Sequence, residues 1–490
     1  MLQAVVLVLA LSLTALAQEE SRPNVVFILA DDWGWGDVGI YNGDRRSRTP
    51  RLDEMGRKGT VFTDFHVANP VCSPSRTAFM TGRHPASLKI HTALTGNHAE
   101  NAARGCADYL PHDIPTLTLL LQGAGYTTGH FGKWHLGATE DAPPPSEYGI
   151  DSSATYVSTD PTRLPGCSGP PNPGPNTKLN CSDQLWPGRS SKAIVDLGME
   201  FINNASVAKK PFYLNLWFHI SHAPLNLMKE QLTNFSMQTF CPWSGMTPDL
   251  EDFTSCPEQI FRAAQHDADV HIGRMLDFLQ SKGLDKNTLV VFSADNGPED
   301  VHIYFNSVGT AGPFRGRKRS IYEGGVRVPF ITYWPGKIPA NKVSDATVSS
   351  LDWFPTIATI TNTTIPANWM GSLRGVDITD LIMSGVPLKE RVHPLMWEWR
   401  YALQGNCWNE APRVAIRAGD MKLLMNTNAT YVELYNLTTS PFEANNVAGQ
   451  NPELVQNLTI QLKNWIHELP EGPIVENKGC RGYKIPEQHP

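Results

Sequence analysis

The sequence has 490 residues, with 41 Lys and Arg against 48 Asp and Glu, which gives a formal net charge of −7. Charged residues make up 18% and hydrophobic residues 41% of the chain, a composition that excludes a disordered polyelectrolyte and a basic nucleic-acid scaffold. The length allows about two to four domains. A chain of this size folds without a disulfide framework, so each of its eight cysteines needs its own explanation.

The N-terminus has the pattern of a secretory signal. Residues 4–16 carry no charge, and the run ends in Ala15-Leu16-Ala17, which is typical of a cleavage site. The run is shorter than the roughly 20 residues that a membrane span needs. We expect a cleaved signal over residues 1–17, with an uncleaved N-terminal anchor as the alternative, and no membrane span elsewhere.

Sequons for N-glycosylation fit passage through an oxidising, glycosylating compartment. Their number exceeds the chance expectation only modestly, so the prediction of the secretory pathway rests mainly on the signal. Lysosomal and extracellular placement fit the sequence equally well. The seven sequons are at Asn180, Asn204, Asn234, Asn362, Asn428, Asn436 and Asn457.

Four short apolar runs predict a buried sheet. They are rich in β-branched and aromatic residues and lack polar alternation, which indicates strands covered on both faces and therefore a parallel sheet. Helical patterns at 116–123, 193–203 and 260–282 lie between them, so the chain predicts an α/β fold. The runs cover residues 24–30, 126–131, 212–218 and 289–294.

Polar side chains follow each of these runs. In α/β folds, sites form beyond the carboxyl ends of the strands. Four such clusters predict a single site assembled from distant segments. The clusters are Asp31-Asp32, Lys133 with His135, His219 with His222, and Asp295-Asn296.

The chain changes character after about residue 390. Short strands are expected at 413–417, 422–425 and 431–437, followed by an amphipathic helix at 452–469. We therefore predict a catalytic domain over 22–385 and a smaller α+β domain over 390–490. The Pro- and Gly-rich segment 161–176 is expected to be a loop near the mouth of the site.

The run from Cys72 to Arg83 reads as a short helix. Ser73 can cap it, Pro74 suits its first turn, and Gly82 can end it. Cys72 then lies at a helix N-terminus, where backbone N–H groups favour an anionic nucleophile or an anionic ligand.

Two motifs make the chain resemble the type I, formylglycine-dependent sulfatases. The first is C-x-P-S-R followed by T-G-R at 72–83, and the second is Gly-Lys-Trp-His-Leu-Gly at 132–137. Among animal sulfatases the chain looks like the group of arylsulfatases A and B and N-acetylgalactosamine-6-sulfatase. The resemblance implies an alkaline-phosphatase-like fold: a large mixed, mostly parallel sheet sandwiched by helices, with a smaller C-terminal domain of an antiparallel sheet plus a helix.

The resemblance also implies the chemistry. Cys72 is expected to be oxidised to formylglycine by the formylglycine-generating enzyme, and the hydrated aldehyde is the expected nucleophile. One hydroxyl of this diol attacks sulfur, and the other later expels sulfate by elimination, a route closed to a serine. The implied activity is that of a sulfuric ester hydrolase, which cleaves the S–O bond of an aryl sulfate or a sulfated saccharide.

The resemblance assigns a divalent metal to an all-oxygen ligand set. Such ligands suit Ca²⁺ or Mg²⁺, which the sequence does not separate. The implied ligands are Asp31, Asp32, Asp295, Asn296 and the formylglycine at Cys72.

Further roles carry over from the same family. Arg76 is expected to hold the deprotonated diol, and Ser158 or Thr159 to donate to the sulfate. His222 is the expected general acid for the departing alcohol, and His135 the expected base for the elimination. His219 is interpreted as a structural histidine at a strand end. The residues implied to bind the sulfate are Lys133, His135, His222 and Lys318.

Each of these residues also has a structural explanation. Asp31-Asp32 and Asp295-Asn296-Gly297 alone would be ordinary turns, and isolated lysines would be surface charge. Their combination with the cysteine signature favours a site. Glu323-Gly-Gly is interpreted as backbone architecture, and Trp33 and Trp35 either stack on a substrate or pack in the core.

Seven cysteines remain besides Cys72. The pairs Cys167–Cys181 and Cys241–Cys256 would close local loops, and the resemblance to arylsulfatase B implies Cys106–Cys480. Cys407 is then left over, either free or intermolecular.

Two alternative functions stay open. A phosphoester or phosphonate hydrolase of the same superfamily would share the fold and the metal site. A catalytically silent, sulfatase-like binding protein would have lost a core residue, and none is missing. The variable loops 138–192 and 225–257 are expected to set the substrate.

Overall fold

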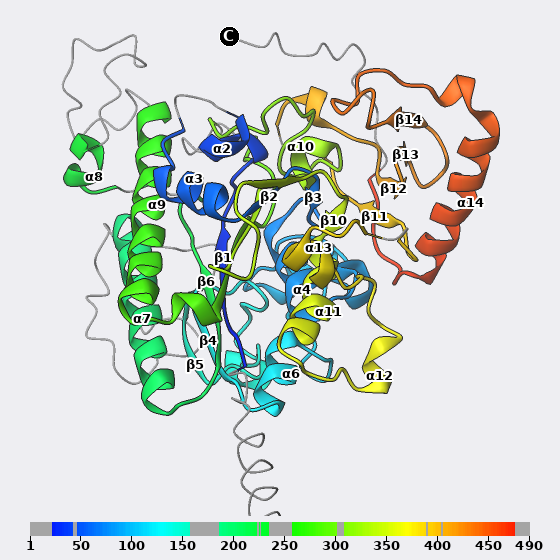
Figure 1. The fold of residues 1–490 in the computed structure, drawn as a ribbon. Helices are drawn as coiled ribbons and strands as arrows, with labels where there is room; N and C mark the ends of the chain where they lie inside the picture. Colours follow the sequence, from blue (N-terminus) through cyan, green and yellow to red (C-terminus); the bar gives the residue numbers. More distant parts are fainter. Residues whose placement is uncertain are drawn as a thin grey trace, which may run out of the picture.

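The computed structural model describes residues 22–42, 47–156, 186–222, 225, 227–234, 257–300, 308–388, 391–402 and 405–475. Its centre is an eight-stranded sheet in the order β5-β4-β6-β1-β7-β8-β2-β9 (Figure 1). The first five strands in this order pair in parallel, whereas β8 is antiparallel to both neighbours. The predicted mixed, mostly parallel sheet is confirmed. The strands are β1 (Asn24–Ala30), β2 (Thr60–Phe62), β4 (Thr127–Lys133), β5 (Ser152–Tyr156), β6 (Phe212–Trp217), β7 (Thr288–Ala294), β8 (Phe330–Tyr333) and β9 (Lys342–Ser344).

The four predicted strands are neighbours at the centre of this sheet. Strand β1 pairs with β6 and β7, and every residue of these three strands is buried. Their ends lie level, because Ala30 pairs with Ala294 and Leu29 with Trp217. The prediction placed the end of β4 at residue 131, but the strand continues to Lys133, which is therefore its last residue.

Helices cover both faces of the sheet. Helices α3 (Pro50–Lys58), α7 (Trp186–Val207) and α9 (Pro257–Ser281) lie on one side, and α4 (Cys72–Thr81), α6 (Leu117–Gly123) and α11 (Trp353–Ile360) lie on the other (Figure 1). Among the described residues, no helix is both long and apolar enough to cross a bilayer. Shorter elements are α2 (Gly39–Asn42), β3 (Phe65–His66), α5 (His98–Ala103), α8 (Lys229–Asn234), α10 (Glu323–Val326), β10 (Val348–Ser349), α12 (Ala367–Met370) and α13 (Thr379–Ser384).

A second, four-stranded antiparallel sheet lies at the C-terminal end. It consists of β11 (Leu395–Glu398), β12 (Val414–Ala418), β13 (Met421–Met425) and β14 (Glu433–Asn436), in chain order. Helix α14 (Pro452–Glu468) packs Leu458 and Leu462 against it in a separate hydrophobic cluster. The predicted antiparallel sheet plus helix is confirmed, although β11 was not predicted. The domain boundary near residues 385–390 stays a prediction.

Helix α4 begins differently from the prediction. Cys72 is its first residue, and Val71 is the N-cap without a side-chain hydrogen bond. The prediction that Ser73 caps the helix was wrong, because its hydroxyl oxygen accepts a hydrogen bond from the Leu94 backbone at 3.0 Å. Gly82 ends the helix as expected, with a φ of 63° that glycine adopts without strain.

The cysteines depart from the predicted pairing. Cys407 is disulfide-bonded, so the prediction that it is left over was wrong. Cys106 is a free thiol, 3.6 Å from the hydroxyl of Tyr401, so the predicted pair Cys106–Cys480 was wrong. Cys72 is also a free thiol. The predicted pairs Cys167–Cys181 and Cys241–Cys256 lie outside the described residues, as do the signal and the loop 161–176.

The aromatic pair after β1, Trp33 and Trp35, packs in the core. Trp33 is fully buried against Phe292, with ring centroids 5.7 Å apart. Trp35 packs edge-on against Tyr41 and Phe314 and donates its indole N–H to Thr63. Of the two interpretations left open, core packing is therefore the one that the structure supports.

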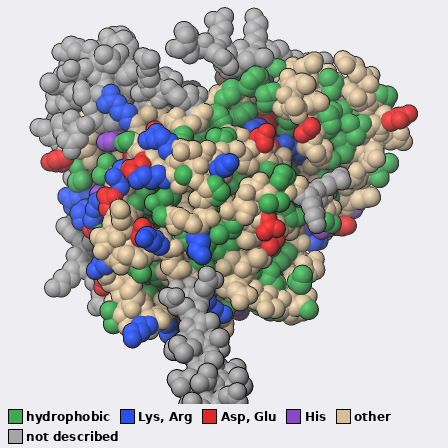
Figure 2. All heavy atoms as spheres, in the orientation of Figure 1, with side chains coloured by type: hydrophobic (Ala, Val, Ile, Leu, Met, Phe, Trp, Pro, Cys, Tyr) green, Lys and Arg blue, Asp and Glu red, His purple; other side chains and the backbone are tan. Residues whose placement is uncertain are grey.

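Charges of both signs are mixed on the surface. On the face shown in Figure 2, Lys and Arg side chains gather over α3 and α9 with Asp and Glu among them. Hydrophobic and neutral side chains prevail over the C-terminal sheet on this face. This distribution forms no stripe of positive charge of the kind that binds nucleic acid.

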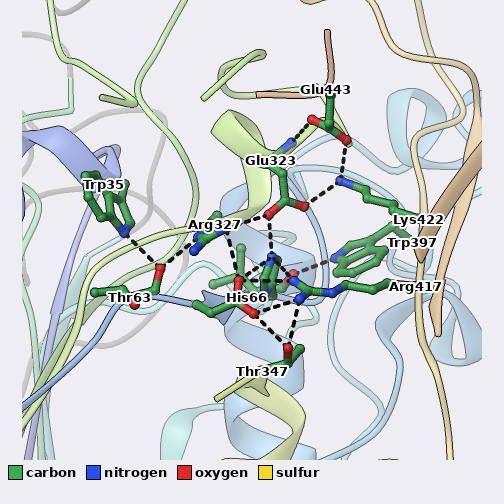
Figure 3. A network of polar contacts seen from close by, with 12 residues as sticks. Trp35, Thr63, His66, Glu323, Arg327, Thr347, Trp397, Arg417, Lys422 and Glu443 are labelled. Carbon is green, nitrogen blue, oxygen red and sulfur yellow. Dashed lines mark hydrogen bonds and ion pairs between the residues drawn. The ribbon is translucent and has the colours of Figure 1, made fainter. Parts of the chain in front are cut away.

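A buried network of charges joins the two sheets (Figure 3). At its centre is Glu323, the first residue of α10, whose carboxylate contacts His66 at 2.9 Å and Lys422 of β13 at 2.8 Å. Lys422 also contacts Glu443 at 2.9 Å, and Glu443 accepts the backbone N–H of Glu323. The interpretation of Glu323-Gly-Gly as architecture is thus incomplete, because the glutamate side chain itself connects the sheets.

The second half of the network is centred on Asp64. Arg417 of β12 binds both oxygens of this carboxylate, at 3.1 and 2.8 Å, and Arg327 binds one of them at 3.1 Å (Figure 3). Together the network holds three carboxylates and three cations of which none is exposed by more than 12%. Buried charges are stable only when they are paired in this way.

We predict that Lys422→Met destabilises the protein strongly, because it removes the cation that contacts the carboxylates of both Glu323 and Glu443. The expected loss is about 3–5 kcal/mol in the free energy of unfolding, measured by urea titration. Lys58→Met is the matched control, since Lys58 pairs with Glu54 at 2.6 Å while 59% exposed, and should cost less than about 1 kcal/mol. Equal losses in the two variants would contradict the assigned role of the network.

Candidate active site

The carboxyl ends of the central strands bring acidic side chains together at one point. Asp31 and Asp32 follow β1, Asp295 follows β7, and Cys72 begins α4; their ligand atoms all lie within 4.8 Å of one another. The backbone N–H of Asp32 donates to Asp295 at 3.2 Å. Asn296 adds its amide N–H to Asp32 at 2.8 Å. The sheet therefore assembles the predicted site from segments far apart in the sequence.

Three cations compensate the three carboxylates. Lys133 contacts Asp31 at 2.5 Å, and Lys318 contacts both oxygens of Asp32 at 2.6 and 2.8 Å. Arg76 binds Asp295 through Nε at 3.0 Å and Nη2 at 2.6 Å. Its remaining nitrogen donates to the carbonyl of Lys133 at 2.8 Å, and its guanidinium lies over the ring of Trp217. All six side chains are at most 3% exposed.

The crowding of charge shifts the carboxylate pKa values in opposite directions. Burial and then the charge of Asp31 raise the pKa of Asp295 to about 6. Burial also acts to raise the pKa of Asp32, but the charges of Lys318, His222 and Lys133 outweigh it and hold that pKa well below its usual value. A pKa raised in this way is typical of a buried carboxylate that lies close to another carboxylate.

These residues fit a divalent cation. The carboxylates supply hard oxygen ligands, which Ca²⁺ and Mg²⁺ prefer. The side-chain oxygen of Asn296 is buried and accepts no hydrogen bond from the described residues, whereas its nitrogen is engaged by Asp32 and Gly297. A buried amide oxygen without a donor is costly unless it has another partner, and a cation would supply one.

Cys72 lies against this cluster as an inactive thiol. Its sulfur is 3.6 Å from an oxygen of Asp31. Burial raises the pKa of the thiol to about 12, despite the charges of Lys133 and Lys318. The unmodified side chain is therefore neutral at neutral pH, and a neutral thiol is a weak nucleophile.

Two histidines flank Cys72 in different protonation environments. His135 is buried, and its Nε2 contacts the carbonyl of Leu94 at 3.1 Å. Because a carbonyl only accepts, Nε2 carries the proton and Nδ1 is the basic nitrogen. Burial, followed by the charges of Lys133 and Arg76, lowers the pKa of His135 well below its usual value. This ring is neutral at neutral pH and able to accept a proton.

His222 is the more accessible of the pair. It is 23% exposed, and Nε2 lies 3.9 Å from Asp32. His219, which the sequence analysis interpreted as structural, also lies in the site. Its ring is 5.3 Å from that of His222, and its Nδ1 is 3.8 Å from Asp31. His219 lies three residues before His222, just after the same strand, and this spacing could have predicted that His219 also belongs to the site.

A cavity of about 300 Å³ opens onto these groups. Its inner end is lined by Cys72, His135, His222 and Lys318, and its outer part includes residues from the C-terminal sheet region. The volume lies at the lower end of the range for small-molecule sites, roughly 300–1,000 Å³. A ligand in the cavity would thus contact Cys72 and Lys318 at once.

One acidic residue near the site was not predicted, and two predicted residues lie outside the described part of the chain. Glu299 is 7% exposed, lies 3.4 Å from Lys318 and binds Arg319 with both oxygens. It follows Asp295 by four residues, and no motif distinguishes it from a surface glutamate. Ser158 and Thr159 lie outside the described residues, so the proposed sulfate hydrogen bond stays a prediction.

Comparisons with known proteins relate this chain to the sulfatases. The family model for sulfatases matches residues 23–363, and a model described as N-sulphoglucosamine sulphohydrolase, C-terminal, matches residues 312–471. Arylsulfatase G of Rattus norvegicus is 32% identical over 400 residues, which cover 76% of this chain and 71% of the relative. N-acetylgalactosamine-6-sulfatase of Mus musculus is 31% identical over 403 residues, covering 78% and 70%. The crystal structure of Ps i-CgsB in complex with k-i-k-neocarrahexaose has a TM-score of 0.74 at 24% identity and covers 93% and 95% of the two chains.

We predict that Ca²⁺ raises the melting temperature of chelator-treated protein. An ion that binds only the folded state stabilises it by about 2.7 kcal/mol at 100 times its Kd. Asn296→Ala should weaken this effect, whereas Asn24→Ala should retain it, because Asn24 is equally buried but lies at the opposite end of β1. Thermal unfolding over a series of Ca²⁺ and Mg²⁺ concentrations measures the shift. An ion-independent melting temperature in the wild type would contradict the site.

Proposed function

Since the chain belongs to the sulfatase family and is a sulfuric ester hydrolase, we propose that it releases inorganic sulfate from a sulfated carbohydrate at the Cys72 cavity. One observation carries this proposal: Cys72 and Lys318 line a cavity large enough for a sugar, and both belong to a buried cluster with three carboxylates and two further cations. The matched mouse relative is named for a sulfated amino sugar, and the matched crystal structure contains a neocarrahexaose. Aryl sulfates are proposed as surrogate substrates.

The metal site is proposed for Asp31, Asp32, Asp295 and Asn296, together with residue 72. A bound Ca²⁺ or Mg²⁺ would polarise the sulfate oxygens and lower the pKa of the nucleophile. The six charged side chains of the cluster balance one another, so a divalent ion leaves an excess of positive charge. That excess matches the negative charge of a sulfate ester.

The nucleophile is proposed to arise by oxidation of Cys72 to formylglycine by the formylglycine-generating enzyme. The modified residue would supply a hydroxyl that attacks sulfur and a second hydroxyl that allows sulfate to leave. The position of Cys72 at the N-terminus of α4 places it 3.6 Å from Asp31. Its high thiol pKa supports the modification, because an unmodified cysteine here is a poor nucleophile.

Lys133, Lys318 and Arg76 are proposed to stabilise the negative charge that develops during the reaction. Lys133 contacts Asp31 and Lys318 contacts Asp32, and both lysines are proposed to bind the sulfate oxygens. Arg76 is proposed to stabilise the deprotonated nucleophile. Cations fixed in a water-poor site need no rearrangement as charge develops, which is where most of the rate enhancement is expected.

The two histidines are proposed to move the protons. His222 donates one to the alcohol oxygen as the S–O bond breaks, and its partial exposure and its position in the cavity lining support this role. His135 accepts one at Nδ1 from the second hydroxyl of residue 72 as sulfate is expelled. These two transfers cover the departure of the alcohol and the departure of sulfate.

We also propose that the protein matures in the secretory pathway and acts in a lysosome or outside the cell. The signal over residues 1–17 supports this proposal, as do the sequons. Four of the sequon asparagines are exposed in the structure, which glycosylation requires: Asn204, Asn362, Asn428 and Asn457.

We predict that the wild-type protein hydrolyses 4-nitrophenyl sulfate with a higher kcat/KM than 4-nitrophenyl phosphate, and that Cys72→Ala abolishes both while melting at an unchanged temperature. A preference for phosphate would identify a phosphoester hydrolase instead. Absence of turnover, together with an unmodified Cys72 peptide by mass spectrometry in protein from a competent secretory cell, would favour the silent binding protein.

We predict that His222→Ala slows sulfates of poor leaving groups much more than aryl sulfates. A nitrophenolate departs without a proton, whereas a sugar alkoxide needs one, so general acid catalysis is worth about 10²–10⁴-fold only for the sugar. The measurement compares kcat for 4-nitrophenyl sulfate and a sugar sulfate in wild type and variant. Equal losses on both substrates would remove His222 as the acid.

A further inference from the structure

The segment Trp397-Glu398-Trp399-Arg400-Tyr401 forms an aromatic wall beside the cavity, which Trp399 and Tyr401 line. It comprises the end of β11 and the residues that follow. In extended backbone, alternate side chains point to opposite faces, so the three aromatic residues share one face and the charged residues the other. Trp399 and Tyr401 line the cavity, and their rings pack edge-to-face with centroids 5.2 Å apart.

The wall is held rigidly from behind. Glu398 pairs with His91 and with Arg400 at 2.7 Å, and both carboxylate oxygens are thereby engaged. Arg400 also donates to the carbonyl of Pro470 at 3.1 Å. Trp397 donates its indole N–H to Val67 at 2.8 Å. These contacts fix the backbone on both sides of Trp399.

Trp399 itself has an unused donor. It is 4% exposed, and its indole N–H makes no hydrogen bond to the described residues. A buried indole N–H usually finds an acceptor. The side chain lines the cavity, so a ligand there would pack against the ring. A sugar offers an apolar C–H face for such aromatic rings.

The charges along the cavity point to an anionic ligand. Arg104, Lys318 and Arg319 line it, whereas none of the described lining residues is Asp or Glu. This local excess of cations contrasts with the net charge of −7 of the chain. One sulfate ester, bound at the inner end by Lys318, leaves the outer cations without a counterpart on the substrate.

Arg104 is the outer cation best placed to bind a substrate anion. Arg319 already binds both oxygens of the buried Glu299. Arg104 pairs instead with Glu100, and these side chains are 35% and 43% exposed, so the pair is weak and exchangeable. Its backbone is fixed, since the Tyr401 hydroxyl donates to the Arg104 carbonyl at 2.7 Å, and its Nη1 donates to Ala93 at 3.3 Å.

We propose that Trp399, Tyr401 and Arg104 form a subsite for the sugar that bears the scissile sulfate, and that this subsite selects sugars carrying a second anionic group. The ring lies on the aromatic wall, and Arg104 binds the second anion, a carboxylate or another sulfate, by charge-assisted hydrogen bonds. The inference rests on the proposed sulfatase function and adds the substrate class and the residues that recognise it.

The test compares matched substrates. Methyl hexosides sulfated at O2, O3, O4 or O6 are each paired with a version that carries a second sulfate or, where C6 is free, a carboxylate there. Released sulfate gives kcat/KM for every pair, and 4-nitrophenyl sulfate reports the chemistry without a sugar. In at least one pair, the doubly anionic sugar should be preferred by about tenfold to hundredfold, the range for hydrogen bonds to charged groups. If the preference appears for the substrates with a second sulfate, the second anion is a sulfate; if it appears for those with a carboxylate at C6, the anion is a carboxylate.

Variants assign the preference to the subsite. Arg104→Gln should reduce the ratio between the two members of that pair by about tenfold, whereas Arg57→Gln, an exposed arginine on α3, should leave the ratio unchanged. Trp399→Phe should lower kcat/KM for sugar sulfates relative to 4-nitrophenyl sulfate, with thermal unfolding confirming that it folds. If Trp399→Phe does not fold, the Arg104→Gln ratio decides.

The outcomes separate the two proposals. Turnover of 4-nitrophenyl sulfate with no preference in any sugar pair would overturn this inference and leave the sulfatase function standing. An equal loss on both members of the pair in Arg104→Gln would also overturn it. Absence of sulfate release from every substrate by protein with modified Cys72 would overturn the proposed function itself.

Discussion

The buried charge cluster at the carboxyl edge of the sheet is the constraint on which the rest of the structure depends. Three carboxylates and three cations lie there almost entirely out of water, and such charges persist only when opposite charges lie close by. The compensation is pairwise, because each cation contacts a different carboxylate. Any loss of one partner leaves a buried, unpaired charge, so the site is also part of the stability of the fold. The pairs are Lys133 with Asp31, Lys318 with Asp32, and Arg76 with Asp295.

The parallel sheet fixes where the segments that carry this cluster begin. Because β1 pairs in register with both β6 and β7, the segments that leave these strands begin side by side. The backbone then departs from ordinary conformations. Asp32 and His135 have φ values of 62° and 57°, in the left-handed region that costs non-glycine residues energy. Such conformations persist where the surrounding packing fixes them, and here they turn both side chains toward Cys72.

The sequence was sufficient for the central strands and the charged site, because short apolar runs and the polar residues after them are local signals. It was insufficient where tertiary contacts decide. Strand β11 escaped prediction because Glu398 looks like a surface residue in the sequence, whereas it is buried in the fold and pairs with His91, far away in the chain. Glu323 looked like part of a glycine turn, since Lys422 and His66 reach it only in the fold. Cys407 was misassigned because cysteine spacing does not determine pairing.

The C-terminal sheet takes part both in the buried ion-pair network and in the proposed sugar subsite. The network around Glu323 and Asp64 fixes β12 and β13 to the catalytic sheet through Lys422 and Arg417. Strand β11 pairs with β12, and its Trp397 packs beside His66 in that network. Two residues beyond Trp397, just after the end of the strand, Trp399 lines the cavity. The same segment therefore contacts the buried ion pairs through Trp397 and the cavity through Trp399. Changes at Trp399, Tyr401 or Arg104 can alter which sugar is bound without touching the charges at Cys72, whereas a change in the network moves the wall and the site together.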